Sequence, residues 1–426
     1  MPRCLHRRQF VTALLAGTAG SALLAGCAGA PGPGGLASGG VATGAIGPPA
    51  DPATTRRERE AAAIKVGLLL PLSGGAQTAL VAKALQQAAE LALFERPNTG
   101  LQLIVKDDKG TPDGAKSAAE DVIKAGCELI VGPLFSKSVA AVAPVARAAN
   151  VPVIGFSNDP AAAAPGVYLL SFLTDTEVDR AIDYAAGQGR KTFAALIPDD
   201  AQGRIAETAF RTSVQRRGGT IALVERYQID TTGLIDPSRK LKEAFESANS
   251  PETPIDALFM PAGQDTLSQL ASLLSQARID TSKVKLIGTS GWDYPNAGRD
   301  ARLSGGWFAA PEPRGWHDFA ERFSKAYGLM PPRLASLAFD ALDVAATFAG
   351  QSKDGRYTVA NLARPSGFAG SDGPFRFLSN GRNERGLAIL EMQKAGPIVV
   401  EGAPSSFGGA APQVTTAVPR AAAGLN

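Results

Sequence analysis

Cysteine and histidine, which build many metal centres and reactive sites, are scarce in this sequence. Its 426 residues include 3 cysteines and 2 histidines. A metal cluster built on histidines is therefore excluded, because such sites need several of these ligands. The sequence also contains no Gly-x-Ser-x-Gly elbow, no phosphate-binding P-loop and no metal-ligand spacing. These absences argue against an enzyme, and nothing in the sequence calls for a cofactor.

The N-terminal segment has the pattern of an export signal. A basic head precedes an apolar stretch over residues 10–25, which ends in small residues. The run Leu24-Ala25-Gly26-Cys27 resembles the bacterial lipoprotein signal, which implies removal of residues 1–26 and a lipid on Cys27. An ordinary signal peptide is the alternative. The apolar stretch is shorter than the ~20 residues that a transmembrane helix needs.

Removing this signal changes the charge and the set of reactive side chains. The signal contains three arginines and no acid, so 40 basic residues remain against 40 acids. A neutral chain with interspersed charges gives no reason to expect nucleic-acid binding. Cys127 is then the only cysteine besides Cys27, so no internal disulfide is expected, and we interpret it as a buried structural thiol. His317 remains as the only histidine, which we expect at the surface or at a helix cap. The run Arg7-Arg8-Gln9-Phe10-Val11 also resembles a twin-arginine signal, so the export route stays open.

Composition divides the rest of the chain into three parts. Residues 27–63 are rich in Gly, Ala and Pro and predict a flexible tether, and residues 401–426 predict a disordered tail of similar composition. About 340 residues lie between them, which is too many for one ordinary core. We therefore expect two lobes.

Strand and helix patterns alternate through this central part. A first series of apolar strands and amphipathic helices runs from residue 64 to residue 156, and a second runs from residue 177 to residue 288. Alternation of this kind predicts parallel sheets with helices on both faces. The predicted fold class is therefore α/β, with two doubly wound lobes.

The loops at the predicted strand ends are the candidate sites. In open parallel sheets, ligands bind beyond the carboxyl ends of the strands. Free backbone N–H groups at a helix start in such loops favour anions and polar ligand groups. Ser73, Tyr227 and Trp292 follow predicted strands and are candidates to face a ligand, although a structural role is the alternative for the two aromatic residues. The pairs of aspartates at 107–108 and 199–200 resemble the paired carboxylates of some enzymes. Strand-end loops of this fold often contain such pairs without any catalytic role.

Four ordered runs give a more specific signal: Leu69-Leu70-Pro71-Leu72-Ser73-Gly74, Ile130-Val131-Gly132-Pro133-Leu134-Phe135-Ser136, Ala143-Pro144-Val145-Ala146 and Val151-Pro152-Val153-Ile154-Gly155-Phe156-Ser157. They resemble the Leu/Ile/Val-binding proteins, which are type I periplasmic binding proteins of ABC uptake systems. The resemblance implies two doubly wound lobes joined by three crossings, with ligand in the cleft. We expect the crossings near Thr174, Ala309 and Tyr357. This places residues 64–173 and 309–357 in the first lobe, and 174–308 and 358–400 in the second.

The resemblance also implies ligand-binding residues. Ser136 matches the serine that holds the ligand carboxylate, with Phe135 beside it, and Ser157 and Asn158 belong to a loop that contributes further groups. Three positions depart from the family pattern, namely Asp159 in place of a threonine, Gln202 in place of an aromatic residue, and Ser290 in place of the acid that pairs with the ligand ammonium. A carboxylate at Asp159 would repel a ligand carboxylate. Asp159 would also be able to pair with the ligand ammonium in place of the missing acid. A free amino acid therefore remains a possible ligand.

Two functions are compatible with these features. The first is the binding component of an ABC transporter for an amino acid or another small polar solute, working with a permease in the periplasm. The second is a regulatory lipoprotein, because the chain also resembles the LpoA-like activators of penicillin-binding proteins, which stimulate peptidoglycan synthases by contact. Ala28 after the lipidated cysteine favours anchoring to the outer membrane, and with the long tether and the change at Asp159 it favours this second reading. The prevalence of solute binding in the family gives the first a slight preference.

Overall fold

The structure, a computed structural model, describes residues 63–228, 230, 233–248 and 254–407. The predicted export signal, nearly all of the predicted tether, including Cys27, and residues 408–426 of the predicted tail lie outside these residues. Among the described residues, no helix is long and apolar enough to cross a membrane.

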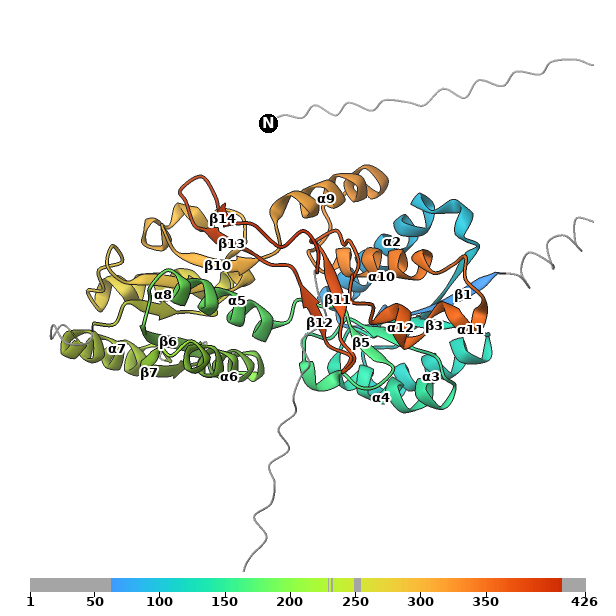
Figure 1. The fold of residues 1–426 in the computed structure, drawn as a ribbon, viewed down its shortest axis with the longest axis horizontal. Helices are drawn as coiled ribbons and strands as arrows, with labels where there is room; N and C mark the ends of the chain where they lie inside the picture. The colour runs from blue at the N-terminus through green and yellow to red at the C-terminus, as the bar shows by residue number, and fades with distance from the viewer. Residues whose placement is uncertain (1–62, 229, 231–232, 249–253, 408–426) are drawn as a thin grey trace, which may run out of the picture. The chain divides into compact units, whose positions relative to one another are not determined.

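The first lobe is built on a five-stranded parallel sheet in the order β2-β1-β3-β4-β5 (Figure 1). Its strands are β1 (Ile64–Leu70), β2 (Leu101–Asp107), β3 (Leu129–Val131), β4 (Val153–Gly155) and β5 (Val167–Leu169). One face packs against α2 (Ala76–Glu95) and α10 (Ala335–Thr347), and the other against α3 (Pro112–Lys124) and α4 (Ser136–Ala148). The strands are rich in Val, Ile and Leu because both faces of this sheet are covered.

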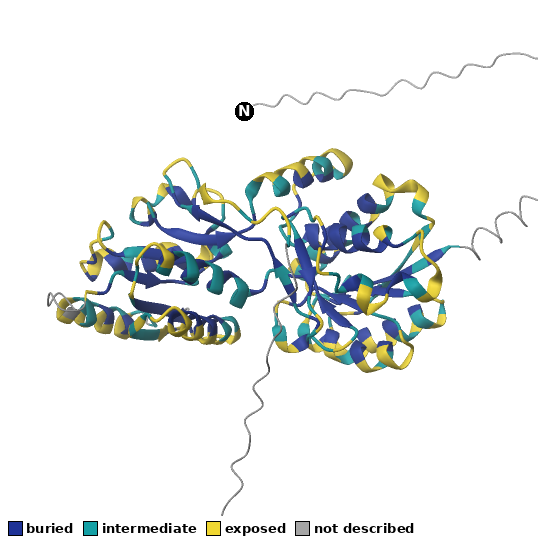
Figure 2. Cartoon of the chain, in the orientation of Figure 1, coloured by how far each residue is buried: buried dark blue, intermediate teal, exposed yellow. Residues whose placement is uncertain are grey.

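The second lobe has a seven-stranded sheet in the order β14-β13-β10-β9-β8-β6-β7. Its strands are β6 (Thr192–Pro198), β7 (Thr220–Tyr227), β8 (Ala257–Phe259), β9 (Lys285–Gly288), β10 (Trp307–Ala310), β13 (Ala388–Glu391) and β14 (Ile398–Glu401). Strands β13 and β14 are antiparallel additions to a parallel sheet. Helices α5 (Thr174–Gly187) and α6 (Ala201–Arg216) cover one face, and α7 (Ile235–Ala248) and α8 (Gln264–Gln276) cover the other. The buried strands and the exposed outer helix faces are visible in Figure 2.

The remaining elements join the lobes or complete one of them. They are α9 (Pro313–Tyr327), α11 (Lys353–Arg356), α12 (Val359–Leu362) and the hairpin of β11 (Phe375–Phe377) and β12 (Asn383–Arg385), together with the short 3-10 helices η1 (Pro97–Thr99), η2 (Pro160–Ala162), η3 (Ser290–Trp292), η4 (Ala297–Arg299) and η5 (Ala301–Leu303). The predicted α/β class with parallel-sheet lobes is confirmed.

Three crossings link the two cores, and one of them differs from the prediction. The first two lie close to the expected places, between Leu170 and Val178 and between Ala310 and Phe319. The third lies after Phe377, well beyond Tyr357, because Phe368, Phe375 and Phe377 are buried in the core of the first lobe. Phe375 and Phe377 have the spacing of a strand, but β11 has only three residues, which is too short a run for the sequence pattern to predict. Strand β14 also extends order to the start of the predicted tail.

Candidate functional site

Two adjoining pockets form a cleft where strand-end loops of the two lobes meet. The outer pocket has a volume of about 1100 Å³ and the inner pocket about 450 Å³. Leu134, Phe135, Asn158 and Gln202 line both pockets. The pockets are therefore continuous with each other and form one cleft, with walls from both lobes.

The first turn of α4 presents backbone donors at the outer pocket. Ser136, Lys137 and Ser138 line this pocket, and the helix begins after Phe135 without a side-chain cap. The amide of Val139 is the first to bond back into the turn, donating to the Phe135 carbonyl at 2.9 Å. Helix geometry therefore gives the three preceding amides no partner. The Oγ of Ser138 is also without a partner although its side chain is only 1 % exposed.

The neighbouring loop of the first lobe is held by its own hydrogen bonds. The amide of Asp159 donates to the Ser157 Oγ at 3.1 Å, and the amide of Ala161 donates to the Asp159 Oδ1 at 3.0 Å. Asn158, Ser157 and Asp159 all line the outer pocket. One carboxylate oxygen of Asp159 is thus occupied by the turn that starts η2.

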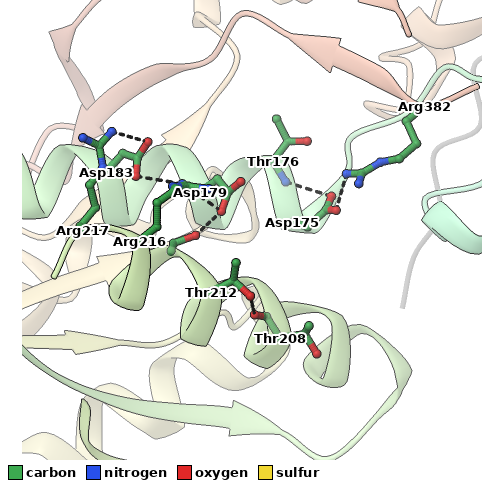
Figure 3. Close-up of polar contacts among 10 residues, drawn as sticks. Asp175, Thr176, Asp179, Asp183, Thr208, Thr212, Arg216, Arg217 and Arg382 are labelled. Carbon is green, nitrogen blue, oxygen red and sulfur yellow. Dashed lines mark hydrogen bonds and ion pairs between the residues drawn. The ribbon is translucent and has the colours of Figure 1, made fainter. Parts of the chain in front are cut away.

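The second lobe contributes α6 and the start of α5 to the outer pocket. Thr174 donates from its Oγ1 to Gln202 Oε1 at 3.0 Å. Farther along these helices, Asp175 pairs with Arg382, Asp179 contacts Ser213 and Arg216, and Asp183 pairs with Arg217 (Figure 3). Each of these acids is thus paired with an arginine, which comes from the end of α6 for Asp179 and Asp183 and from the third crossing for Asp175. Gln202 is the polar side chain of α6 that lines both pockets.

Glu177 lies at the inner pocket and was missed by the sequence analysis. Its carboxylate accepts hydrogen bonds from the Ser290 Oγ at 2.7 Å and from the Ser290 amide at 3.1 Å. Burial raises the pKa of Glu177 to about 7, although the Ser290 hydrogen bonds and the charges of Arg333 and Arg385 oppose the rise. An acid of α5 thus lies within hydrogen-bond distance of Ser290. The sequence did contain one sign of this site, because Glu177 is an acid in the first turn of a helix that directly follows a predicted crossing.

Three predicted residues lie away from the cleft. Trp292 is 0 % exposed and donates its Nε1 hydrogen to the Met260 carbonyl at 3.0 Å, within the core of the second lobe. Tyr227 is buried in the same core. Ser73 is exposed, and its amide donates to Asp107 Oδ1 at 3.2 Å outside both pockets. Although both aromatic residues lie at strand ends, their large apolar side chains are buried in the core and do not face the cleft.

The other predicted positions have simple placements. Phe135, Ser136, Ser157, Asn158, Asp159, Gln202 and Ser290 line one or both pockets. Cys127 is buried and free, and burial raises the pKa of its thiol to about 11. His317 is exposed on α9. In the part of the chain that the structure describes, no three His, Cys, Asp or Glu side chains are grouped to hold a metal ion.

Known proteins share this architecture. The sequence pattern of the periplasmic binding protein family matches residues 63–397. The Leu/Ile/Val-binding protein homolog 6 of Brucella melitensis is 24 % identical over 251 residues, which are 56 % of this chain and 62 % of that protein. The chain thus matches about three fifths of the length of this curated relative.

Two solved structures have a similar fold. A putative branched-chain amino acid ABC transporter protein from Rhodospirillum rubrum superposes with a TM-score of 0.68 at 18 % identity, covering 79 % of this chain and 100 % of that one. A solute-binding protein from Rhodopseudomonas palustris in complex with 3,4-dihydroxybenzoic acid gives 0.58 at 21 % identity, covering 81 % and 98 %. The chain therefore belongs to the periplasmic binding protein family and has the type I fold of its Leu/Ile/Val-binding members.

Proposed function

We propose that this protein is the solute-binding component of an ABC uptake system and holds a small carboxylate ligand in the cleft. The observation that supports this most is the first turn of α4, which has three free amides at the outer pocket and contains the buried, unpartnered Ser138 Oγ. No acid lies in that turn. The positive end of a helix dipole with free N–H groups is a binding site for an anion.

A buried polar atom without a partner is costly, which makes Ser138 informative. Hydroxyl groups removed from water without a hydrogen bond cost about 1–3 kcal/mol. A ligand carboxylate would accept from the Ser136 and Ser138 hydroxyls as well as from the amides. Because the Ser138 Oγ has almost no surface open to solvent, its hydroxyl would have to turn toward the pocket to donate to the ligand.

Glu177 is suited to bind the ammonium group of an amino acid. The inner pocket is lined by the apolar side chains Phe156, Phe172 and Leu334 as well as by Glu177 and Ser290. A ligand ammonium would pair with the Glu177 carboxylate, and an apolar side chain would pack on the walls. We therefore favour a free amino acid. A ligand such as the 3,4-dihydroxybenzoic acid bound by the Rhodopseudomonas protein shares the carboxylate but has no ammonium.

The cellular setting follows from the same proposal. The family implies the periplasm. A lipid on Cys27 would tether the protein to a membrane, with Ala28 favouring the outer one, and the permease of the uptake system would be its partner. Activation of a peptidoglycan synthase, as by LpoA-like lipoproteins, is the alternative function.

Calorimetric titration with the twenty standard amino acids and with hydroxybenzoates tests the proposal. We expect a ligand with micromolar affinity. The Ser136→Ala, Ser138→Ala double variant should bind that ligand at least roughly 10-fold more weakly, because each hydrogen bond to a charged group contributes about 1.5–3 kcal/mol. Ser117→Ala, at an exposed position of α3, is the matched control and should leave the affinity unchanged.

Two results would count against solute binding. One is the absence of binding across the whole panel together with capture of a peptidoglycan synthase, which would favour the activator function. The other is tight binding that the double variant does not weaken, because the α4 turn would then have no part in recognition.

A further inference from the structure

The C-terminal end of the described chain crosses between the lobes a fourth time. Strand β14 ends at Glu401 in the second lobe, and residues 402–407 continue from it to the first lobe. We call residues 402–407 the strap. Its contacts are distinct from the cleft, since none of its residues lines either pocket.

The strap starts from a fixed point on the second lobe. Glu401 pairs with Arg180 of α5 at 2.6 Å, and the same arginine donates from its Nε to the Leu387 carbonyl at 3.0 Å. Leu387 belongs to the buried core on that side of the sheet. The start of the strap is thus tied both to α5 and to the end of the third crossing.

The middle of the strap touches two of the three crossings. The amide of Ala403 donates to the Glu312 Oε1 at 2.9 Å, and Glu312 lies between β10 and α9 in the second crossing. The Pro404 carbonyl oxygen lies beside Gly386 of the third crossing, so close that a Cβ on this glycine would be 3.2 Å from it. These segments must move relative to each other if the lobes rotate.

The far end of the strap is anchored on the first lobe. The Phe407 ring lies over the Arg376 guanidinium, with 4.9 Å between the ring centroid and Cζ. Arg376 is itself buried in β11 and paired with Glu384 at 2.7 Å. The ring also packs on Gly367, where φ is +64° and an added Cβ would come within 3.0 Å of it. An aromatic ring over a guanidinium is a favourable contact in a partly buried site.

We propose that the strap restrains the hinge, so that its release increases the motion of the crossings without unfolding either lobe. The physical reason is that one short segment has contacts on both lobes and on two crossings, and a hinge rotation changes the distances among all of them. The restraint acts whether or not the cleft binds a carboxylate, so it is independent of the proposed function.

Two truncations of the full chain separate the strap from the rest of the tail. One ends at Glu401 and lacks the strap, and the matched control ends at Phe407 and lacks only the residues after it. Hydrogen exchange is followed at the Glu177 amide, which bonds to the Leu173 carbonyl in the first crossing, and at the Gly386 amide, which bonds to the Pro374 carbonyl in the third. We expect exchange at both amides to be about tenfold faster in the shorter variant, with β1 and β6 unchanged. The longer variant should match the full chain.

A point variant distinguishes the loss of the strap contacts from a general effect of shortening the chain. Phe407→Ala removes the anchor on the first lobe and should accelerate exchange at the same two amides to a smaller extent. Equal exchange at the crossings in both truncations would overturn the proposal. Faster exchange throughout β1 or β6 would also overturn it, because the segment would then stabilise a lobe rather than restrain the hinge.

Discussion

Replacing Glu177 by glutamine is expected to weaken the binding of a free amino acid roughly 10- to 150-fold, because a charge-assisted hydrogen bond of about 1.5–3 kcal/mol is lost. Glutamine keeps the size of the side chain and an oxygen for the Ser290 amide, so the fold should be retained. Affinity is measured by titration with leucine and with 4-methylpentanoate, which is leucine without its amino group. The deaminated compound should bind the two proteins equally.

The same residue predicts a pH dependence with a definite sign. Burial raises the pKa of Glu177 to about 7, so the carboxyl is largely protonated below that pH in the ligand-free protein. An ammonium needs the ionised form, and affinity for leucine should therefore fall up to about tenfold per pH unit below that value. The raised pKa also means that stability from the neutral carboxyl is lost as pH rises through about 7. Glu177→Gln should remove both effects.

The matched control for this prediction is Glu321→Gln, at an exposed position of α9. It should bind leucine as the unaltered protein does. Equal affinity of Glu177→Gln for leucine, or equal affinity of the unaltered protein for leucine and 4-methylpentanoate, would show that Glu177 does not recognise an ammonium. Such a result would leave carboxylate binding at α4 intact and would favour ligands without an amino group.

The second large effect concerns stability. Trp292→Ala is expected to lower the free energy of unfolding by about 3–5 kcal/mol, the usual range for a fully buried large aromatic side chain. The indole packs so closely on Gly288 that a Cβ there would be 2.3 Å from the ring, and it also touches Gly306. The truncation leaves a cavity and an unpaired Met260 carbonyl. Denaturant unfolding monitored by circular dichroism measures the change.

A comparison with an exposed aromatic residue sharpens this test. Phe94 is 82 % exposed on α2, so Phe94→Ala should change stability by no more than about 0.5 kcal/mol. If Trp292→Ala changed the free energy of unfolding as little and also weakened ligand binding, Trp292 would have to be a ligand-binding residue of the cleft. Unchanged affinity in the folded fraction is the expected result.

The fold was largely predictable because its strands and helices have clear signals. Strand β1 is a run of branched and apolar residues between a charged segment and Pro71. Helix α6 begins after its N-cap Asp200, whose side chain accepts from the Gly203 amide at 2.7 Å. Local patterns of this kind need no tertiary information. The hairpin of β11 and β12 was not predicted, since its strands have only three residues each and are fixed by burial of their phenylalanines.

The site was predictable only in part. Ser136 and Asn158 lie within five residues of the ends of β3 and β4, so the positions of these strands determine where they lie. Glu177 belongs to a helix, and its approach to Ser290 depends on how α5 packs after the first crossing. Trp292 shows the opposite error, because a loop position did not reveal that its side chain turns back under Gly288 and Gly306. Contacts between distant segments determine both outcomes.

The most direct test of the central claim is a crystal structure of the protein with the tightest ligand found among the amino acids and hydroxybenzoates. The account predicts carboxylate oxygens at hydrogen-bond distance, about 2.7–3.2 Å, from amides of the first turn of α4 and from the Ser138 Oγ. A ligand bound with its carboxylate away from this turn, or outside the cleft between the lobes, would contradict it.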